Sequence, residues 1–360
     1  MADPPKSVGR SGRAGEHTDG TGPADCSPWS VNAVSAPREA FSPRRRPEPL
    51  TVAFVGQSVY FRQCALERPV AGIAPAFIDF RAGASPNALR AALARVDPDV
   101  VLVFRPEIVP EGLFSDLRSV TIGYLTEPLP RAEGDSHPDL CARLSALQRV
   151  DPGGFDRIVC FDPLIAQTAS RILPVWRSLP IPVADGLFMD PRPRRTPPRL
   201  LFIGRSTEHR EWMLAPIKRN HLITHIGHGL FGEALQRMLA SSDVQINLHN
   251  NPYPTFENRV CIALAAGHLV ISEPLSPSHG LRAGVDYLQV QTPRQLAHLA
   301  EQVRACDGAC FEVQLSGRRE AERFRASRVY PELFRDVVED VREKGSARRI
   351  GASASKVREV

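Results

Sequence analysis

Thr255–Arg259 has the residue types that hold phosphate at the start of a helix. Thr255 is a good N-cap, so the sequence predicts a helix that begins at Phe256, with Asn258 and Arg259 in its first turns. The free N–H groups and the dipole of a helix N-terminus attract anions, and one arginine can hold two phosphate oxygens. The structural alternative is that Arg259 is a solvated helix residue.

A second candidate phosphate contact is Gly204-Arg205, which ends an apolar run. Glycine permits a close backbone approach, and Arg205 is suited to phosphate. Further along, His228 lies between Gly227 and Gly229, and its ring is a candidate hydrogen-bond donor to a phosphate or a hydroxyl group. An ordinary strand-end turn is the alternative for Gly204-Arg205.

Polar residues also follow two later apolar runs. Asn247 and Asn250 lie where one run ends, and Glu273 directly follows the run LVIS. Amides suit sugar hydroxyls, and a carboxylate suits the two hydroxyls of a ribose. Turn formation and structural capping are the competing interpretations.

The elements that must position these residues alternate between apolar runs and helical patterns. Runs such as DVVLVF at 99–104 are apolar on both faces, which indicates parallel strands covered on both sides. The alternation starts at residue 50, breaks in the proline-rich stretch 174–199 and restarts at residue 199. We therefore predict an α/β protein of two Rossmann-like domains that face each other across a cleft.

The predicted domains follow from these boundaries. They are a disordered tail at 1–48, a first Rossmann-like domain at 49–185, a proline-rich hinge at 186–198, a second domain with a return helix at 199–345, and a basic tail at 346–360. In open α/β sheets, ligands bind outside the carboxyl ends of the strands. Gly204, His228, Asn250 and Glu273 are predicted at such ends.

Bulk composition narrows the class of protein. The 360 residues are 42% hydrophobic and 24% charged, with a net charge of +5 and 7% aromatic residues, which fits a globular protein and gives no sign of a nucleic-acid partner. Several of the seven cysteines lie in apolar runs, which favours reduced thiols. No apolar segment suits a signal peptide or a membrane span, so we expect a cytoplasmic protein.

No metal site is expected. His221 and His225 lie on a predicted strand, where residues four apart are about 13 Å apart, too far for one ion. Cys306 and Cys310 lack further ligands nearby, and the sequence has no Asp-x-Asp motif.

Residues 243–299 resemble the C-terminal domain of GT-B glycosyltransferases, especially the CgeB-like group. The resemblance rests on a strand that ends in Asn250, on Arg259 in the next helix, on Ala265-Ala266-Gly267, on Glu273, and on the GVDYL segment at 284–288. It implies a glycosyltransferase of the hexosyltransferase kind that takes a sugar from a nucleotide-diphosphate donor, without a metal, to an acceptor not identified. Its donor site would comprise Gly204, Arg205, His228, Gly229, Asn247, Asn250, Asn258, Arg259 and Glu273.

The same resemblance places the acceptor beside the first domain. Gly56, Gln57 and Ser58 follow its first strand, and Glu127 is our candidate for the general base of an inverting reaction. Asp79 and His137 are weaker candidates. A retaining enzyme of this fold needs no such base.

The chain departs from the family pattern at Ile262, where related enzymes usually carry a glutamate. A catalytically silent relative that binds a sugar or a nucleotide as a regulatory partner is therefore the second hypothesis. A dehydrogenase or an epimerase is the third, and neither Gly56 nor Gly204 begins the Gly-x-Gly-x-x-Gly turn of a dehydrogenase.

Overall fold

The computed structural model describes residues 49–131, 137–220, 223–250, 255–305, 308 and 310–345. The two predicted tails, at 1–48 and 346–360, lie outside the described residues, as do His221, Pro254 and Cys306.

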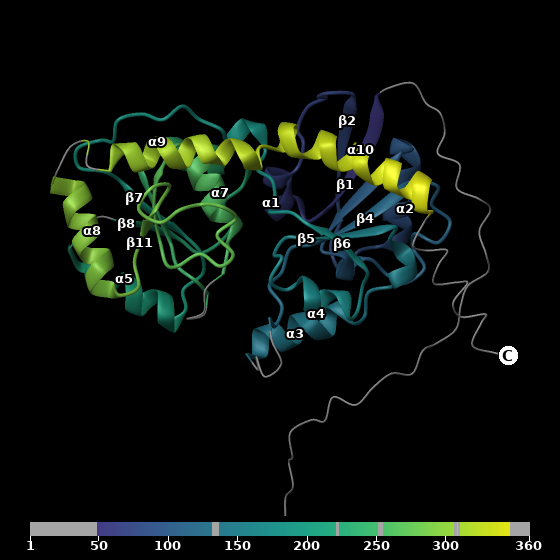
Figure 1. Cartoon of the computed structure of the whole chain (residues 1–360), viewed down its shortest axis with the longest axis horizontal. Helices are drawn as coiled ribbons and strands as arrows, with labels where there is room; N and C mark the ends of the chain where they lie inside the picture. Colours follow the sequence, from purple (N-terminus) through teal and green to yellow (C-terminus); the bar gives the residue numbers. More distant parts are fainter. Residues whose placement is uncertain are drawn as a thin grey trace, which may run out of the picture. The chain divides into compact units, whose positions relative to one another are not determined.

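The first half of the chain forms a six-stranded parallel sheet in the order β2-β1-β3-β4-β5-β6 (Figure 1). Its strands are β1 (Leu50–Gly56), β2 (Ile73–Asp79), β3 (Val100–Phe104), β4 (Val120–Leu125), β5 (Arg157–Cys160) and β6 (Val175–Ser178). The helices that connect them are α1 (Ser58–Phe61), η1 (Arg62–Cys64), α2 (Pro86–Val96), η2 (Pro106–Ile108), α3 (Pro138–Leu147), η3 (Pro152–Gly154), α4 (Ala166–Ser170) and η4 (Asp185–Leu187). Every residue of β3, β4 and β5 is buried, as strands covered on both faces require.

The second half forms a five-stranded parallel sheet in the order β11-β10-β9-β7-β8. Its strands are β7 (Leu200–Ile203), β8 (Ile223–Ile226), β9 (Val244–Asn247), β10 (Leu269–Ser272) and β11 (Leu288–Gln289). Its helices are α5 (Glu208–Asn220), α6 (Gly232–Ser241), α7 (Asn258–Ala265), α8 (Pro293–Ala305), α9 (Phe311–Glu320) and η5 (Ala321–Phe324). The predicted fold class, two parallel α/β sheets in succession, is confirmed.

The two sheets share one topology. Numbered in chain order, the second sheet runs 2-1-3-4-5, and the first runs 2-1-3-4-5 with a sixth strand added at the end. The connections therefore leave in opposite directions from the first and third strands, β1 and β3 in one sheet and β7 and β9 in the other. Such a switch point opens a crevice at the carboxyl ends of those two strands. In the second sheet the residues that follow the strands there are Gly204-Arg205 and Leu248–Asn250.

The last helix, α10 (Ala326–Lys344), packs against the first sheet although it follows the second in sequence (Figure 1). Tyr330 and Phe334 lie in the core of the first sheet, and the Tyr330 ring meets the Phe54 ring edge-on at 4.9 Å between centroids. The Tyr330 hydroxyl donates to the carbonyl of Cys64 at 2.6 Å. The last described helix therefore belongs to the core of the first sheet.

The structure differs from the expected elements in three places. The proline-rich stretch 174–199 contains an edge strand, β6, in which three residues are half-buried and Ser178 is exposed, so its apolar pattern is too weak to be recognised. The two-residue strand β11 was not expected either. Helix α7 begins at Asn258 rather than Phe256, with Glu257 at its N-cap position and no side-chain capping bond.

Among the described residues, no helix is long and apolar enough to span a membrane.

Candidate active site

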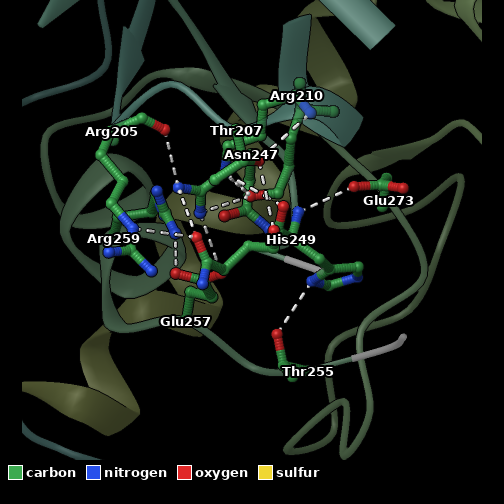
Figure 2. A network of polar contacts seen from close by, with 12 residues as sticks. Arg205, Thr207, Arg210, Asn247, His249, Thr255, Glu257, Arg259 and Glu273 are labelled. Carbon is green, nitrogen blue, oxygen red and sulfur yellow. Dashed lines mark hydrogen bonds and ion pairs between the residues drawn. The ribbon is translucent and has the colours of Figure 1, made fainter. Parts of the chain in front are cut away.

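The polar residues of the second sheet gather where β7 and β9 end (Figure 2). Arg205 follows β7, Arg210 projects from the first turn of α5, and Arg259 projects from the first turn of α7. The guanidinium groups of Arg210 and Arg259 pair with the carboxylate of Glu257, and that of Arg205 contacts Asn250. The three arginines and Glu257 are together called the arginine cluster below.

Arg210 joins the ends of the two strands at the switch point. Its Nε donates to the carbonyls of Leu248 at 3.1 Å and His249 at 3.0 Å, and its Nη1 donates to the Arg205 carbonyl at 3.1 Å. Its Nη2 lies 3.4 Å from Oε1 of Glu257. The side chain is only 4% exposed, so its main role is to form the floor of the site.

Arg259 reaches from α7 across the end of β7. Its Nη1 donates to the carbonyl of Ile203 at 2.6 Å, and its Nη2 forms an ion pair with Oε2 of Glu257. The path crosses Gly204, where a β-carbon would stand 2.6 Å from Arg259 Nη1. Glycine at this strand end therefore makes the room that the guanidinium occupies.

Arg205 is the exposed member of the arginine cluster, with 66% of its side chain accessible. Its Nε lies 3.4 Å from Oδ1 of Asn250, and its Nη2 lies 3.4 Å from Oδ2 of Asp139 on α3. These contacts are long, and the side chain remains available to a ligand that approaches from solvent.

The cluster holds more positive charge than its own carboxylate neutralises. Burial, reinforced by the charge of Arg205, lowers the pKa of the Arg210 guanidinium to about 10. Burial also lowers the pKa of Arg259 well below its usual value, and Arg210 adds to that effect. Both shifts arise first from burial, to which a neighbouring guanidinium adds, and both disfavour the charged forms. A bound anion would supply the missing negative charge.

His249 hydrogen-bonds to the loop after β10 and to the segment that leads into α7. Burial lowers the pKa of its imidazole to about 4, so the ring is neutral near pH 7. Its Nε2 lies 2.9 Å from the Pro274 carbonyl, to which it donates, and its Nδ1 accepts from the Thr255 hydroxyl at 2.9 Å. His249 thus fixes the chain that leads into α7.

Glu273 is engaged by protein groups on both oxygens. Its Oε2 accepts the backbone N–H of His249 at 2.7 Å, and its Oε1 lies 2.8 Å from Nε2 of His209. Only 6% of the residue is exposed. Each oxygen can accept a second hydrogen bond, so the expectation that Glu273 binds a ribose diol stays a prediction.

Three expectations need correction. Thr255 does not cap α7, since its hydroxyl bonds to His249. Asn247 is fully buried and donates from Nδ2 to the hydroxyl of Ser272 at 2.9 Å, so it does not reach the arginine cluster. Asn258 donates from Nδ2 to the sulfur of Cys64 at 3.2 Å, away from the three arginines.

His228 and Gly229 lie exposed in the loop after β8. His225, at the end of β8, is half-buried, and its Nε2 lies 2.8 Å from the Gly204 carbonyl. In the part of the chain that the structure describes, no group of three or more His, Cys, Asp and Glu side chains is arranged to hold a metal ion.

The first-sheet candidates lie at the carboxyl ends of their own strands. Gly56 ends β1, Gln57 occupies the N-cap position of α1, and the backbone N–H of Ser58 donates to Oδ1 of Asp79 at 2.7 Å. His137 is the N-cap of α3, where its Nδ1 accepts from the backbone N–H of Asp139.

Glu127 follows β4 and lies between two arginines. Its Oε2 is 3.2 Å from Nε of Arg143, and its Oε1 is 3.7 Å from Nη1 of Arg105. The side chain is 32% exposed. It therefore remains accessible to a hydroxyl group.

Sequence reasoning missed Arg210 and His209, which lie side by side on α5. Both lie in a polar stretch at the start of α5, and no apolar run directly precedes them as one precedes Gly204-Arg205. The spacing of five residues between Arg205 and Arg210, directly after Gly204, was the available signal.

No family model matches this sequence, and no curated protein matches it either. Solved structures do. HepE from Anabaena, in its crystal structure with UDP, superposes with a TM-score of 0.50 at 11% identity, over 81% of this chain and 100% of that one.

Two further structures are similar to the same extent. Sucrose-phosphate synthase from Thermosynechococcus elongatus gives a TM-score of 0.54 at 13% identity, over 81% of this chain and 99% of its own. A glycosyltransferase from Rickettsia africae gives a TM-score of 0.50 at 11% identity, over 81% of this chain and 99% of its own. At such identities the likeness concerns the fold. Two Rossmann-like sheets, a shared 2-1-3-4-5 strand order and a last helix that returns to the first sheet are the GT-B fold, and this chain has that fold.

Proposed function

We propose that this protein is a glycosyltransferase that takes a sugar from a nucleotide-diphosphate donor. The observation that carries the proposal is the arginine cluster at the β7–β9 switch point, where burial lowers the pKa of both Arg210 and Arg259. A diphosphate brings two or more negative charges to a site that lacks them. The UDP complex of HepE, which shares the fold, supports a nucleotide of this kind.

In this proposal Arg205 makes the direct contact, because it is the exposed arginine. Arg259 lies behind it at 16% exposure, at the N-terminus of α7, where the helix dipole also favours an anion. Arg210 hydrogen-bonds to the carbonyls that follow both strands and adds positive charge at the floor of the site. Charge-assisted bonds from arginine to phosphate are short and strong, so the cluster supplies electrostatic stabilisation to the departing diphosphate.

The arginines carry the neutralising charge that a divalent metal supplies in other sugar-transferring enzymes, and we therefore propose metal-independent transfer. Glu273 stays the proposed partner of the ribose diol, because each of its oxygens can accept a second hydrogen bond beside those from His209 and His249. Glu127 is proposed as the base that accepts the proton of the acceptor hydroxyl.

A second candidate function is a silent relative that binds a nucleotide or a sugar without transfer. It is favoured by Ile262, which is 7% exposed in the apolar core of the second sheet where related enzymes usually carry a glutamate. The structure provides no carboxylate at that point of α7.

The test is a thermal-shift screen of the purified protein with UDP, GDP, dTDP, CMP and NAD. A ligand at 100 times its dissociation constant stabilises the fold by about 2.7 kcal/mol, which is a readable shift. We expect at least one nucleoside diphosphate to raise the melting temperature and NAD to leave it unchanged. Release or transfer of a sugar from the matching nucleotide sugar then separates the transferase from the silent relative.

Arg205→Ala is expected to remove most of that shift. Arg237→Ala is the matched control, because Arg237 is 72% exposed on α6 and pairs only with Glu233 among the described residues. A shift that survives in Arg205→Ala, or that is lost equally in Arg237→Ala, would contradict the assignment of the anion site.

A further inference from the structure

A second pocket lies in the first half of the chain, at the carboxyl ends of β3 and β4. It encloses about 230 Å³. One wall comes from the segment that follows β4, the other from α3, and the rim comes from the turn after β3. All of its residues are among those that the structure describes: Arg105, Glu107, Leu125, Thr126, Glu127, Leu129, Ala142, Arg143, Ala146 and Leu147.

The inner surface of this pocket is apolar. Leu125, Leu129 and Leu147 are each 4% exposed and form its base, and the methyl groups of Ala142 and Ala146 line the α3 side. A carbohydrate ring presents hydroxyls on all of its edges and would leave them without partners against these walls. The base of the pocket therefore suits a hydrocarbon or aromatic body.

The rim is charged and holds a strained residue. Arg105 adopts φ 66° and ψ 76°, a left-handed conformation that costs a non-glycine residue of order 1–3 kcal/mol. In this conformation its Nε donates to Oε1 of Glu107 at 2.8 Å, and its Nη1 faces Glu127 at 3.7 Å. Backbone strain of this kind clusters at ligand sites, and here it holds a planar guanidinium over the mouth of the pocket.

One carboxylate at the rim of the pocket can serve a hydroxyl group. Glu127 is 32% exposed there, and a ligand hydroxyl could donate to its oxygens. The hydroxyl oxygen of Thr126, the preceding residue, is buried and has no hydrogen-bond partner among the described residues. A hydrogen bond to Glu127 places the polar end of a ligand at the candidate base.

The pocket wall is connected to the arginine cluster. Asp139 lies one helical turn before Arg143 on α3, and its Oδ2 contacts Nη2 of Arg205 at 3.4 Å and Nδ2 of Asn250 at 3.3 Å. The helix that lines the pocket thus also reaches the proposed donor site.

We infer that this pocket is the acceptor site and that its acceptor is a small aromatic hydroxyl compound, a phenol. This inference rests on the proposed function. A cavity of about 150 Å³ holds a benzene ring, so 230 Å³ accommodates one substituted ring, and the Arg105 and Arg143 guanidiniums can stack on its face. In the reaction the phenolic oxygen forms a bond to the anomeric carbon while the bond from that carbon to the diphosphate oxygen breaks. The phenolic proton passes to Glu127, and the nucleoside diphosphate leaves.

The test measures binding of 4-methylphenol to the full-length protein by saturation-transfer NMR, with methyl β-glucoside as the comparison probe. Ala146→Phe fills the pocket from a half-exposed position of α3, which keeps the risk to folding small. Ala94→Phe is the matched control, since Ala94 is exposed on α2 and does not line the pocket. UDP-induced thermal shifts are measured on the same three proteins.

We expect saturation transfer to 4-methylphenol in the wild type and in Ala94→Phe, a signal at least fivefold weaker in Ala146→Phe, and little transfer to methyl β-glucoside. The UDP shift is expected to be the same in all three. Stronger transfer to the glucoside, or a phenol signal unchanged in Ala146→Phe, would overturn the acceptor class even if UDP binds. If the phenol signal depends on the pocket but no nucleotide raises the melting temperature, the donor proposal is wrong, and the pocket then has no role as an acceptor site.

Discussion

The guanidinium of Arg259 occupies the space that a side chain at Gly204 would need: a β-carbon at Gly204 would stand 2.6 Å from Nη1 of Arg259 and 3.2 Å from Nη1 of Arg210. The first distance is closer than a carbon and a nitrogen can approach without a bond. The strand end and the first turn of α7 therefore constrain one another, and the position of the guanidinium depends on the absence of a side chain at Gly204.

Gly204→Ala is expected to displace Arg259 and to weaken UDP binding about tenfold or more, equivalent to about 1.4 kcal/mol. Gly227→Ala is the control, because the nearest atom to its new β-carbon is 4.0 Å away. Calorimetric titration with UDP measures both. Equal affinities in the two variants would show that Arg259 takes no part in binding.

Arg210→Met is expected to destabilise the fold by roughly 2–5 kcal/mol, since it leaves the carbonyls of Leu248 and His249 without their buried donor. Arg237→Met, on the exposed face of α6, should change stability by less than about 0.5 kcal/mol. Guanidinium chloride unfolding provides the comparison. A harmless Arg210→Met would show that Arg210 does not hold the strand ends together.

The contrast between Arg205 and Arg210 shows what the sequence can reveal and what it cannot. Arg205 follows an apolar run and a glycine, so its place at a strand end is readable from the sequence alone. Arg210 lies in a polar stretch. Its partners are the carbonyl of Arg205, which follows β7, and the carbonyl of Leu248, which follows β9 and lies 38 residues later in the chain. Only the tertiary arrangement reveals that it is buried.

Glu273 and Asn258 illustrate the same limit. Each was expected to contact a ligand because of its type and its place at the end of a strand or the start of a helix. In the structure Glu273 bonds to His209, 64 residues earlier, and Asn258 bonds to Cys64, 194 residues earlier. The parallel sheets themselves were predictable, because continuous apolar runs between helical segments indicate strands buried on both faces. Short edge strands such as β6 lack that pattern.

Ile262→Glu is expected to lower the free energy of unfolding by roughly 2–5 kcal/mol, because the side chain at this position lies in an apolar core. Ile262→Val should cost only about 0.5–1.5 kcal/mol. Chemical denaturation measures both, and UDP titration accompanies it. A glutamate variant that stays stable and binds UDP more tightly would mean that this position faces the ligand.

Stability is expected to fall with pH below about 6.5, in part through His268. Burial lowers the pKa of this imidazole to about 4, below the unfolded value of about 6.5, so unfolding takes up a proton between these pH values. The free energy of unfolding then decreases by about 1.4 kcal/mol per pH unit for this residue as the pH falls towards 4.

His268→Gln removes that contribution, so its unfolding free energy should depend less steeply on pH between 6.5 and 4. His298→Gln, at an exposed position of α8, should keep the wild-type slope. Urea unfolding titrations at several pH values measure the pH dependence of the unfolding free energy for each protein. Identical slopes for all three proteins would refute the role given to His268.

The most direct measurement is calorimetric titration of the wild type and Arg205→Ala with UDP and with uridine at low and moderate salt. The account predicts that UDP binds the wild type at least tenfold more tightly than uridine does, and that salt and Arg205→Ala each shrink this difference, because the diphosphate is held by the arginine cluster. If UDP and uridine bind with equal affinity, or if the preference for UDP persists undiminished in Arg205→Ala, the arginine cluster is not the donor site.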